Sequence, residues 1–206
     1  LYLKISSGKS TVDTTCNCTT GTVSTTDATL SKVIWGMYYL GIDCSLRSSG
    51  VALHNAEDGY RTHLIKTSSK DCEGDRLQHI FNQFTQIVKG KNIQLACMEG
   101  PSYSSVNKSF SMGAAYGIFK LVCSIQGIPL MIVPPTKIKK YFSGSGHSKK
   151  VKMMESCYTH LGLRVSSDDV ADALAGCCLA RDSYSRGAIN TPGTRASLEV
   201  IMSTEE

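Results

Sequence analysis

The stretch SSDDVADALAG, residues 166–176, combines three aspartates with the start of an apolar, helix-like run. Asp169 and Asp172 are three residues apart, which places both side chains on one face of a helix, roughly 60° apart in projection. Asp168 and Asp172 form a second same-face pair. The small apolar residues that follow predict a closely packed helix, and burying an unpaired carboxylate is costly. We therefore expect these carboxylates to face a positively charged partner.

Two further acids come at the ends of predicted strands. Asp43 follows the apolar and aromatic run that begins at Lys32, and Glu99 closes the short apolar run IQLACME. The crossover between these two strands returns the chain to the first one, so we expect the strands to lie side by side. Asp43 and Glu99 then meet at the carboxyl edge of the sheet, where open sheets hold their ligands.

Four carboxylates at one point repel one another and are tolerated only around cations. Oxygen ligands without His or Cys suit Mg²⁺ or Mn²⁺ rather than Zn²⁺. Two such ions, about 4 Å apart, clamp the attacking and leaving oxygens of a phosphate during an in-line displacement. Each acid also has an ordinary interpretation, as a helix cap worth about 1 kcal/mol or as a turn residue. The metal hypothesis rests on all four occurring in suitable elements together.

The order of the elements predicts an α/β fold. Three strands in a meander are followed by strands that alternate with helices, and the chain then closes with helices. This order predicts a mixed five-stranded sheet, three antiparallel strands plus parallel additions, with helices on both faces. The expected strands are residues 32–43, 50–55, 60–68, 93–99 and 128–135, and the expected helices are residues 75–90, 109–127, 136–142, 149–163 and 168–186.

Length and composition bound the class of protein. The 206 residues, 41% of them hydrophobic, suffice for one domain with a full core. We expect that domain at residues 32–184, after a Ser/Thr-rich, poorly ordered extension at residues 1–31 and before a tail at residues 185–206. A net charge of +5 allows an acidic partner such as nucleic acid without requiring one. No apolar run reaches the length of a membrane span, and nine scattered cysteines predict reduced thiols in an intracellular reducing compartment.

Four sequence blocks, in order, resemble those of the RuvC Holliday junction resolvases of the RNase H-like nuclease superfamily. Each block alone is weak, but the ordered set is specific and covers roughly residues 33–182. The blocks are LGIDCSLRSSGVAL, ACMEGP, VPPTKIKKYFSGSGHSKKVKMM and DDVADALAGCCLA.

The resemblance implies an RNase H-like fold and a set of catalytic metal ligands, Asp43, Glu99, Asp169 and Asp172. Asp169 is chosen over Asp168 because the D-x-x-D pattern begins there, and Asp168 is interpreted as the helix cap beside the site. The implied cofactor is Mg²⁺, two ions per active site, with Mn²⁺ as a substitute. The implied assembly is a homodimer that binds branched DNA and cuts one strand of a four-way junction at each site.

The resemblance also implies DNA-binding residues and a dimer helix. Tyr103 follows the Glu block one place later than the family's aromatic wedge, and His147 stands where the family has its first lysine. Lys149 and Lys150 come next, and this pair is suited to binding a phosphate. The small-residue helix at residues 109–123 matches the element through which the family's subunits pair, although packing within one subunit would also account for its composition.

Two alternatives remain at this point. The stretch GIDCSLRSSG also resembles the first phosphate loop of the actin-like ATPase superfamily, which would make the protein an ATP-dependent kinase. That fold needs two related domains and a second glycine-rich loop, which this sequence lacks. The other alternative is a junction-binding protein without catalytic activity, and the presence of all four acids argues against it.

Overall fold

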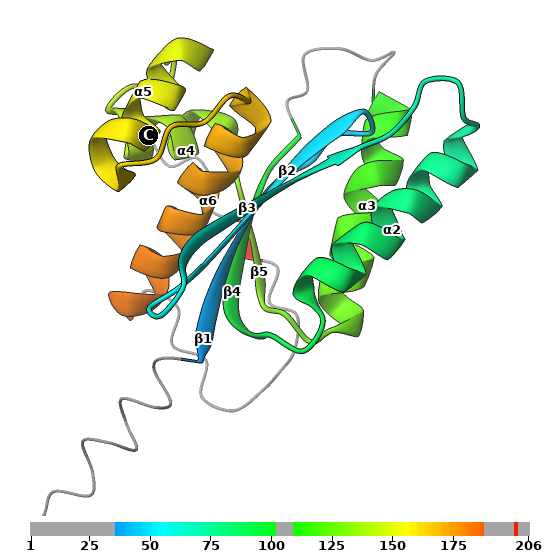
Figure 1. The fold of residues 1–206 in the computed structure, drawn as a ribbon, viewed down its shortest axis with the longest axis horizontal. Helices are drawn as coiled ribbons and strands as arrows, with labels where there is room; N and C mark the ends of the chain where they lie inside the picture. The colour runs from blue at the N-terminus through cyan, green and yellow to red at the C-terminus, as the bar shows by residue number, and fades with distance from the viewer. Residues whose placement is uncertain (1–35, 102–108, 188–199, 202–206) are drawn as a thin grey trace, which may run out of the picture.

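The computed structural model describes residues 36–101, 109–187 and 200–201, which form one mixed sheet with helices on both faces (Figure 1). The strands are β1 (Met37–Asp43), β2 (Ser48–Asn55), β3 (Gly59–Lys66), β4 (Asn92–Glu99), β5 (Leu130–Val133) and β6 (Val200–Ile201). The helices are α2 (Glu73–Val88), α3 (Ser109–Ile125), α4 (Pro135–Ser143), α5 (Lys150–Leu161) and α6 (Asp168–Ser185).

The sheet order is β3-β2-β1-β4-β5-β6. Strands β1, β2 and β3 pair antiparallel, whereas β4 and β5 add in parallel to the other side of β1. The expected mixed sheet of five strands is therefore confirmed, including the predicted pairing of the first and fourth strands. The two-residue strand β6 adds a sixth strand, parallel to β5.

Strands β1 and β2 carry side chains of different size on the two faces of the sheet. Leu40 and Ile42 of β1 point to the face covered by α2 and α3, where Phe84 and Phe119 meet edge to face with ring centroids 4.7 Å apart. On the opposite face, β1 and β2 present smaller residues, among them Gly41, to α6. This alternation follows from the two-residue period of a strand, and it lets α6 approach the sheet more closely than a row of large side chains would.

Backbone packs directly on backbone between α6 and the centre of the sheet. A Cβ atom at Gly41 would overlap the carbonyl oxygen of Ala173, and one at Gly50 would overlap the carbonyl oxygen of Asp169. The Ala- and Leu-rich sequence of α6 favours helix strongly, and two aspartates in its first turn interact favourably with the helix dipole. These two glycines therefore fix how deeply the start of α6 sits against β1 and β2.

Three further expectations from the sequence concern the cysteines, membrane-spanning helices and the domain boundaries. The seven described cysteines are all free, and Cys72 alone among them is exposed. No helix within the described parts of the chain is long and apolar enough to cross a membrane. The expected extension at residues 1–31 lies outside the described residues, as does most of the expected tail, so the proposed domain boundaries stay predictions.

Candidate active site

The strand-ending acids lie on neighbouring parallel strands. Ile42 of β1 pairs with Met98 of β4, so the next residues, Asp43 and Glu99, follow side by side at the carboxyl ends of the two strands. Both side chains are partly buried at this edge. The position predicted for these two acids from the strand pattern is therefore the one that they occupy.

The N-terminal end of α6 brings its aspartates to the same edge. The close approach of Gly50 to the Asp169 backbone places the first turn of α6 over the start of β2. There the Ser48 hydroxyl donates a hydrogen bond of 2.5 Å to Asp169 Oδ2. The helix thus delivers acids to the sheet edge that already carries Asp43 and Glu99.

The pKa values show that the acids act on one another. Burial, and then the negative charges of Glu99, Asp172, Asp169 and Asp168, raise the pKa of Asp43 to about 8. Burial and the charge of Asp172 raise the pKa of Glu99 to about 7. Such values arise where carboxylates are both desolvated and close to like charges. The acids therefore share one strongly negative site.

Asp172 is the acid with the clearest need for a partner. Burial is the main cause that raises its pKa, and its Oδ1 atom is buried without a hydrogen-bond partner among the described residues. A buried acceptor without a partner costs free energy, on the order of 1–3 kcal/mol. A cation at this edge of the sheet would satisfy that oxygen.

Asp168 does not have the role expected from the sequence. The helix cap position belongs to Ser167, so the interpretation of Asp168 as the cap is wrong by one residue. Asp168 instead forms an ion pair with Lys150 at the start of α5, and a hydrogen bond from Lys150 lowers the pKa of Asp168. Because SSDD offers several residues able to cap, the sequence alone did not separate the cap from its neighbours.

The predicted DNA-binding residues separate into two groups. His147 and Lys149 are exposed on the loop and helix start that follow α4, with Lys149 at the cap position of α5. Lys150 is also exposed, but its ammonium is engaged by Asp168, which ties this basic segment to the head of α6. Tyr103 lies outside the described residues, so the structure says nothing of its place.

Sequence reasoning missed two residues that touch or influence the site. Ser48 reaches Asp169 across 121 positions of sequence. Lys139 of α4 carries a charge that lowers the pKa of both Glu99 and Asp172, against the effect of burial. Five lysines lie within residues 135–150, and only tertiary packing determines which of them faces the acids.

The donor set fits an open divalent-metal site. Its donors are carboxylate oxygens, which Mg²⁺ and Mn²⁺ prefer, and the unpaired Oδ1 of Asp172 is available. Within the described ranges, no three His, Cys, Asp or Glu side chains are arranged to hold a metal ion by themselves.

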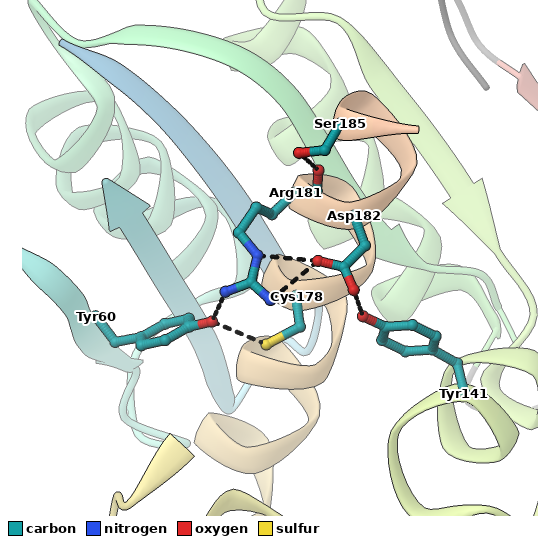
Figure 2. Close-up of polar contacts among 6 residues, drawn as sticks. All are labelled: Tyr60, Tyr141, Cys178, Arg181, Asp182 and Ser185. Carbon is teal, nitrogen blue, oxygen red and sulfur yellow. Dashed lines mark hydrogen bonds and ion pairs between the residues drawn. The ribbon is translucent and has the colours of Figure 1, made fainter. Parts of the chain in front are cut away.

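A second polar cluster occupies the other end of α6, away from these acids (Figure 2). Asp182 accepts a 2.7 Å hydrogen bond from the Tyr141 hydroxyl and pairs with Arg181 at 2.9 Å. Arg181 also donates to the Tyr60 hydroxyl, which lies 3.2 Å from the Cys178 sulfur. Figure 2 shows these groups linking α6 to β3 and α4, so this cluster is a structural clamp in which the charges are paired.

Comparison with known proteins identifies the family. The model of the family "Crossover junction endodeoxyribonuclease RuvC" matches residues 39–179, a span that contains all four site acids. The chain belongs to the RuvC family. Similar RuvC proteins come from Synechococcus sp. strain WH7803, 30% identical over 145 residues that make up 68% of this chain and 94% of the relative, and from Prochlorococcus marinus strain SARG, 30% identical over 146 residues with the same coverage.

Solved RuvC structures share the fold. The structure of RuvC from Thermus thermophilus superposes with a TM-score of 0.62 at 20% identity and covers 73% of this chain and 97% of that one. The T. thermophilus RuvC in complex with a Holliday junction substrate superposes equally well, with a TM-score of 0.62 at 22% identity, and covers 74% and 96%. The RNase H-like fold expected from the RuvC resemblance is therefore confirmed.

Proposed function

We propose that this protein is a divalent-metal-dependent endonuclease that resolves four-way DNA junctions by paired nicks. One observation carries the proposal: in a chain of the RuvC family, the acids at the ends of β1 and β4 and at the start of α6 share one negative site. The curated relatives are named crossover junction endodeoxyribonucleases, and one T. thermophilus structure holds a Holliday junction substrate. The fold, the family and the site chemistry support the same activity.

The proposed ligands are Asp43, Glu99, Asp169 and Asp172. When bound, two Mg²⁺ ions, or Mn²⁺ in their place, would make a water nucleophilic and stabilise the leaving 3′ oxygen of the cleaved phosphodiester. The protein contributes four carboxylates held by rigid elements, two on adjacent strands and two on one helix face. Asp172 offers an oxygen that has no competing partner among the described residues. Lys139 partly offsets the negative charge that Glu99 and Asp172 create.

The basic segment next to the site is proposed to bind the DNA backbone. His147 and Lys149 are exposed on the segment between α4 and α5, Lys150 begins α5, and the Lys150–Asp168 ion pair connects that segment to the site. Phosphate contacts of this kind position a duplex without reading its sequence. Tyr103 stays a prediction as a further DNA-binding residue.

A homodimer is proposed through α3. Phe110, Leu121 and Ile125 are exposed by 89%, 48% and 60%, and a shallow groove runs past Gly113 and Gly117 on the same helix. Apart from atoms of its own helix backbone, no atom of the described residues lies within 4 Å of the place of a Cβ on either glycine, so a second helix can approach closely there. A second copy of the chain would cover this apolar face and supply a second active site for the opposite strand of the junction.

The dimer can be tested by analytical ultracentrifugation. Leu121→Glu places a charge within the proposed interface and should shift the protein from dimer to monomer and abolish paired nicks. Tyr158→Glu is a matched control, because Tyr158 is 55% exposed on α5 and far from that face. A wild-type protein that sediments as a monomer at all concentrations would contradict the proposal.

The activity itself is tested with a synthetic four-way junction in Mg²⁺. We expect symmetric nicks in two opposing strands, mapped by end-labelling each strand, and we expect none with Asp43→Asn. Cleavage by Asp43→Asn at the wild-type rate, or no nicks by the wild type, would overturn the proposal. Junction binding by the wild type without any nicks would instead support the non-catalytic alternative.

The kinase alternative is not favoured. Family membership over residues 39–179 assigns GIDCSLRSSG to the first strand and turn of a nuclease. The free thiols of the seven described cysteines agree with a reducing intracellular compartment, where we propose the enzyme acts. We also retain residues 32–184 as the proposed nuclease domain.

A further inference from the structure

The turn between Asp43 and β2 is held rigidly from several sides. The Ser49 side chain donates to the Ser45 carbonyl at 2.5 Å and accepts from the Ser45 amide at 3.0 Å. The Leu46 carbonyl accepts hydrogen bonds from the Thr67 hydroxyl at 2.5 Å and from the Arg76 guanidinium at 3.2 Å. Six polar groups, from this turn, from Thr67 just after β3 and from Arg76 of α2, are thus satisfied within one small region, and such a network fixes the backbone that it surrounds.

Ser48 is the residue that this braced turn presents to α6. It begins β2, where its backbone pairs with Lys66 of β3. Its side chain, half-buried, donates to Asp169 Oδ2 at 2.5 Å, the length of a strong hydrogen bond from a hydroxyl to a carboxylate. Gly50, two residues later, contacts the Asp169 backbone, so the same strand holds both the main chain and the side chain of Asp169.

This contact distinguishes Asp169 from the other acids of its turn. Asp168 forms an ion pair with Lys150, and Asp172 Oδ1 has no hydrogen-bond partner among the described residues. A hydroxyl donates one hydrogen, so Ser48 orients one oxygen of Asp169 and leaves the other for a cation. Loss of a hydrogen bond that orients a metal ligand in this way typically lowers metal affinity by about 10- to 100-fold.

We propose that Ser48 is a positioning residue that presents the Asp169 carboxylate to the divalent metal. This inference rests on the proposed function, because it assumes that Asp169 is a metal ligand. Ser48 does not touch the reacting phosphate; it acts through Asp169. Its hydroxyl is the operative group, and the shape of the side chain is secondary.

The decisive experiment compares Ser48→Thr with Ser48→Val, two variants of equal shape of which only the first keeps a hydroxyl. Mn²⁺ binding is measured on DNA-free protein by electron paramagnetic resonance of the free ion, and the Mg²⁺ dependence of junction cleavage is measured separately. We expect Ser48→Val to bind Mn²⁺ about 10- to 100-fold more weakly and to need correspondingly more Mg²⁺. Ser48→Thr should stay within about threefold of wild type, on the same reasoning that orientation requires the hydroxyl.

Ser45→Ala serves as the control for the turn, because among the described residues the Ser45 hydroxyl accepts from the Arg47 amide and has no hydrogen bond to the acids. Thermal unfolding of each variant with EDTA shows whether the fold is kept. Equal Mn²⁺ affinity for Ser48→Val and Ser48→Thr would overturn the role of Ser48. If the wild type fails to cut junctions, the proposed function fails, while the Mn²⁺ titration still decides whether Ser48 supports a metal site.

Discussion

Two aspartates of helix α6, Asp172 near its start and Asp182 near its end, lie in opposite surroundings. Asp172, near the start, has a raised pKa because it is buried near other acids, and one of its oxygens has no hydrogen-bond partner among the described residues. Asp182, near the finish, is also subject to burial, which raises its pKa, but the Tyr141 hydroxyl and the Arg181 guanidinium lower that pKa below its usual value (Figure 2). The Asp172 carboxylate therefore lacks a partner for one oxygen, whereas the Asp182 carboxylate is paired with Arg181 and hydrogen-bonded by Tyr141.

The contrast separates stability from function within one helix. A charge pair that is satisfied in the free protein stabilises the fold but offers nothing to a ligand. An acid without a partner destabilises the free protein and becomes favourable only when a cation arrives, so ligand binding stabilises the folded state. We infer that the start of α6 serves the reaction and that its end anchors the helix.

The largest expected effect comes from neutralising each aspartate in turn. Asp172→Asn should lower junction cleavage at least about 1000-fold, because metal sites supply several kcal/mol of transition-state stabilisation. Its free energy of unfolding, measured by urea at pH 8 in EDTA, should stay the same or rise. Asp182→Asn on the same helix should keep cleavage within a few-fold and lower the free energy of unfolding by about 1 kcal/mol. The reverse pattern would refute the division between the two ends.

The next effect concerns the close approach that lets α6 present its acids. Gly41→Ala adds a methyl group that overlaps the Ala173 carbonyl, so we expect the free energy of unfolding to fall by about 3 kcal/mol or more. Gly74→Ala is the matched control, since its new methyl would meet only the Cys72 sulfur at 3.9 Å. That control should be neutral or slightly stabilising, because alanine favours helix over glycine. Equal stability of the two variants in urea unfolding would contradict the backbone packing described for α6.

A smaller, pH-dependent effect follows from Asp43. Its pKa rises from 3.8 in the unfolded chain to about 8 in the folded protein, so the unfolded state loses its proton first as the pH increases. Stability therefore falls between about pH 4 and pH 8, by on the order of a few kcal/mol. The difference in Tm between wild type and Asp43→Asn, measured in EDTA across this range, isolates Asp43. Asp43→Asn should gain relative stability as the pH rises, and a constant difference would show that Asp43 ionises normally.

The smallest effect is expected in the clamp at the end of α6. Tyr141→Phe removes the hydroxyl that donates to Asp182 at 2.7 Å and should lower the free energy of unfolding by about 1 kcal/mol. Tyr158→Phe, on exposed α5, should change it by less than about 0.5 kcal/mol. Chemical denaturation of both variants gives the comparison. A loss of cleavage by Tyr141→Phe without loss of stability would show that the clamp is part of the active site.

Much of the site follows from local sequence patterns. Asp43 and Glu99 could be placed because each ends an apolar strand, and Asp169 and Asp172 could be placed because helical spacing is regular. The contacts of Asp168 with Lys150 and of Ser48 with Asp169 could not be predicted in this way. They join elements that are distant in sequence, and the depth and rotation of α6 against the sheet decide them.

The nearly continuous burial of α6 bears on how the helix keeps its orientation. Its buried positions include Val170, Ala171, Ala173, Leu174 and Ala175, which lie on several sides of the helix. A helix so evenly small and apolar would bury similar area after a turn of about 100° about its own axis, the step of one residue. Hydrophobic burial alone therefore does not select an angular setting. The close backbone contacts of Gly41 with Ala173 and of Gly50 with Asp169 do select one. They fix the rotation of α6 about its axis, and with it the direction in which its acids point.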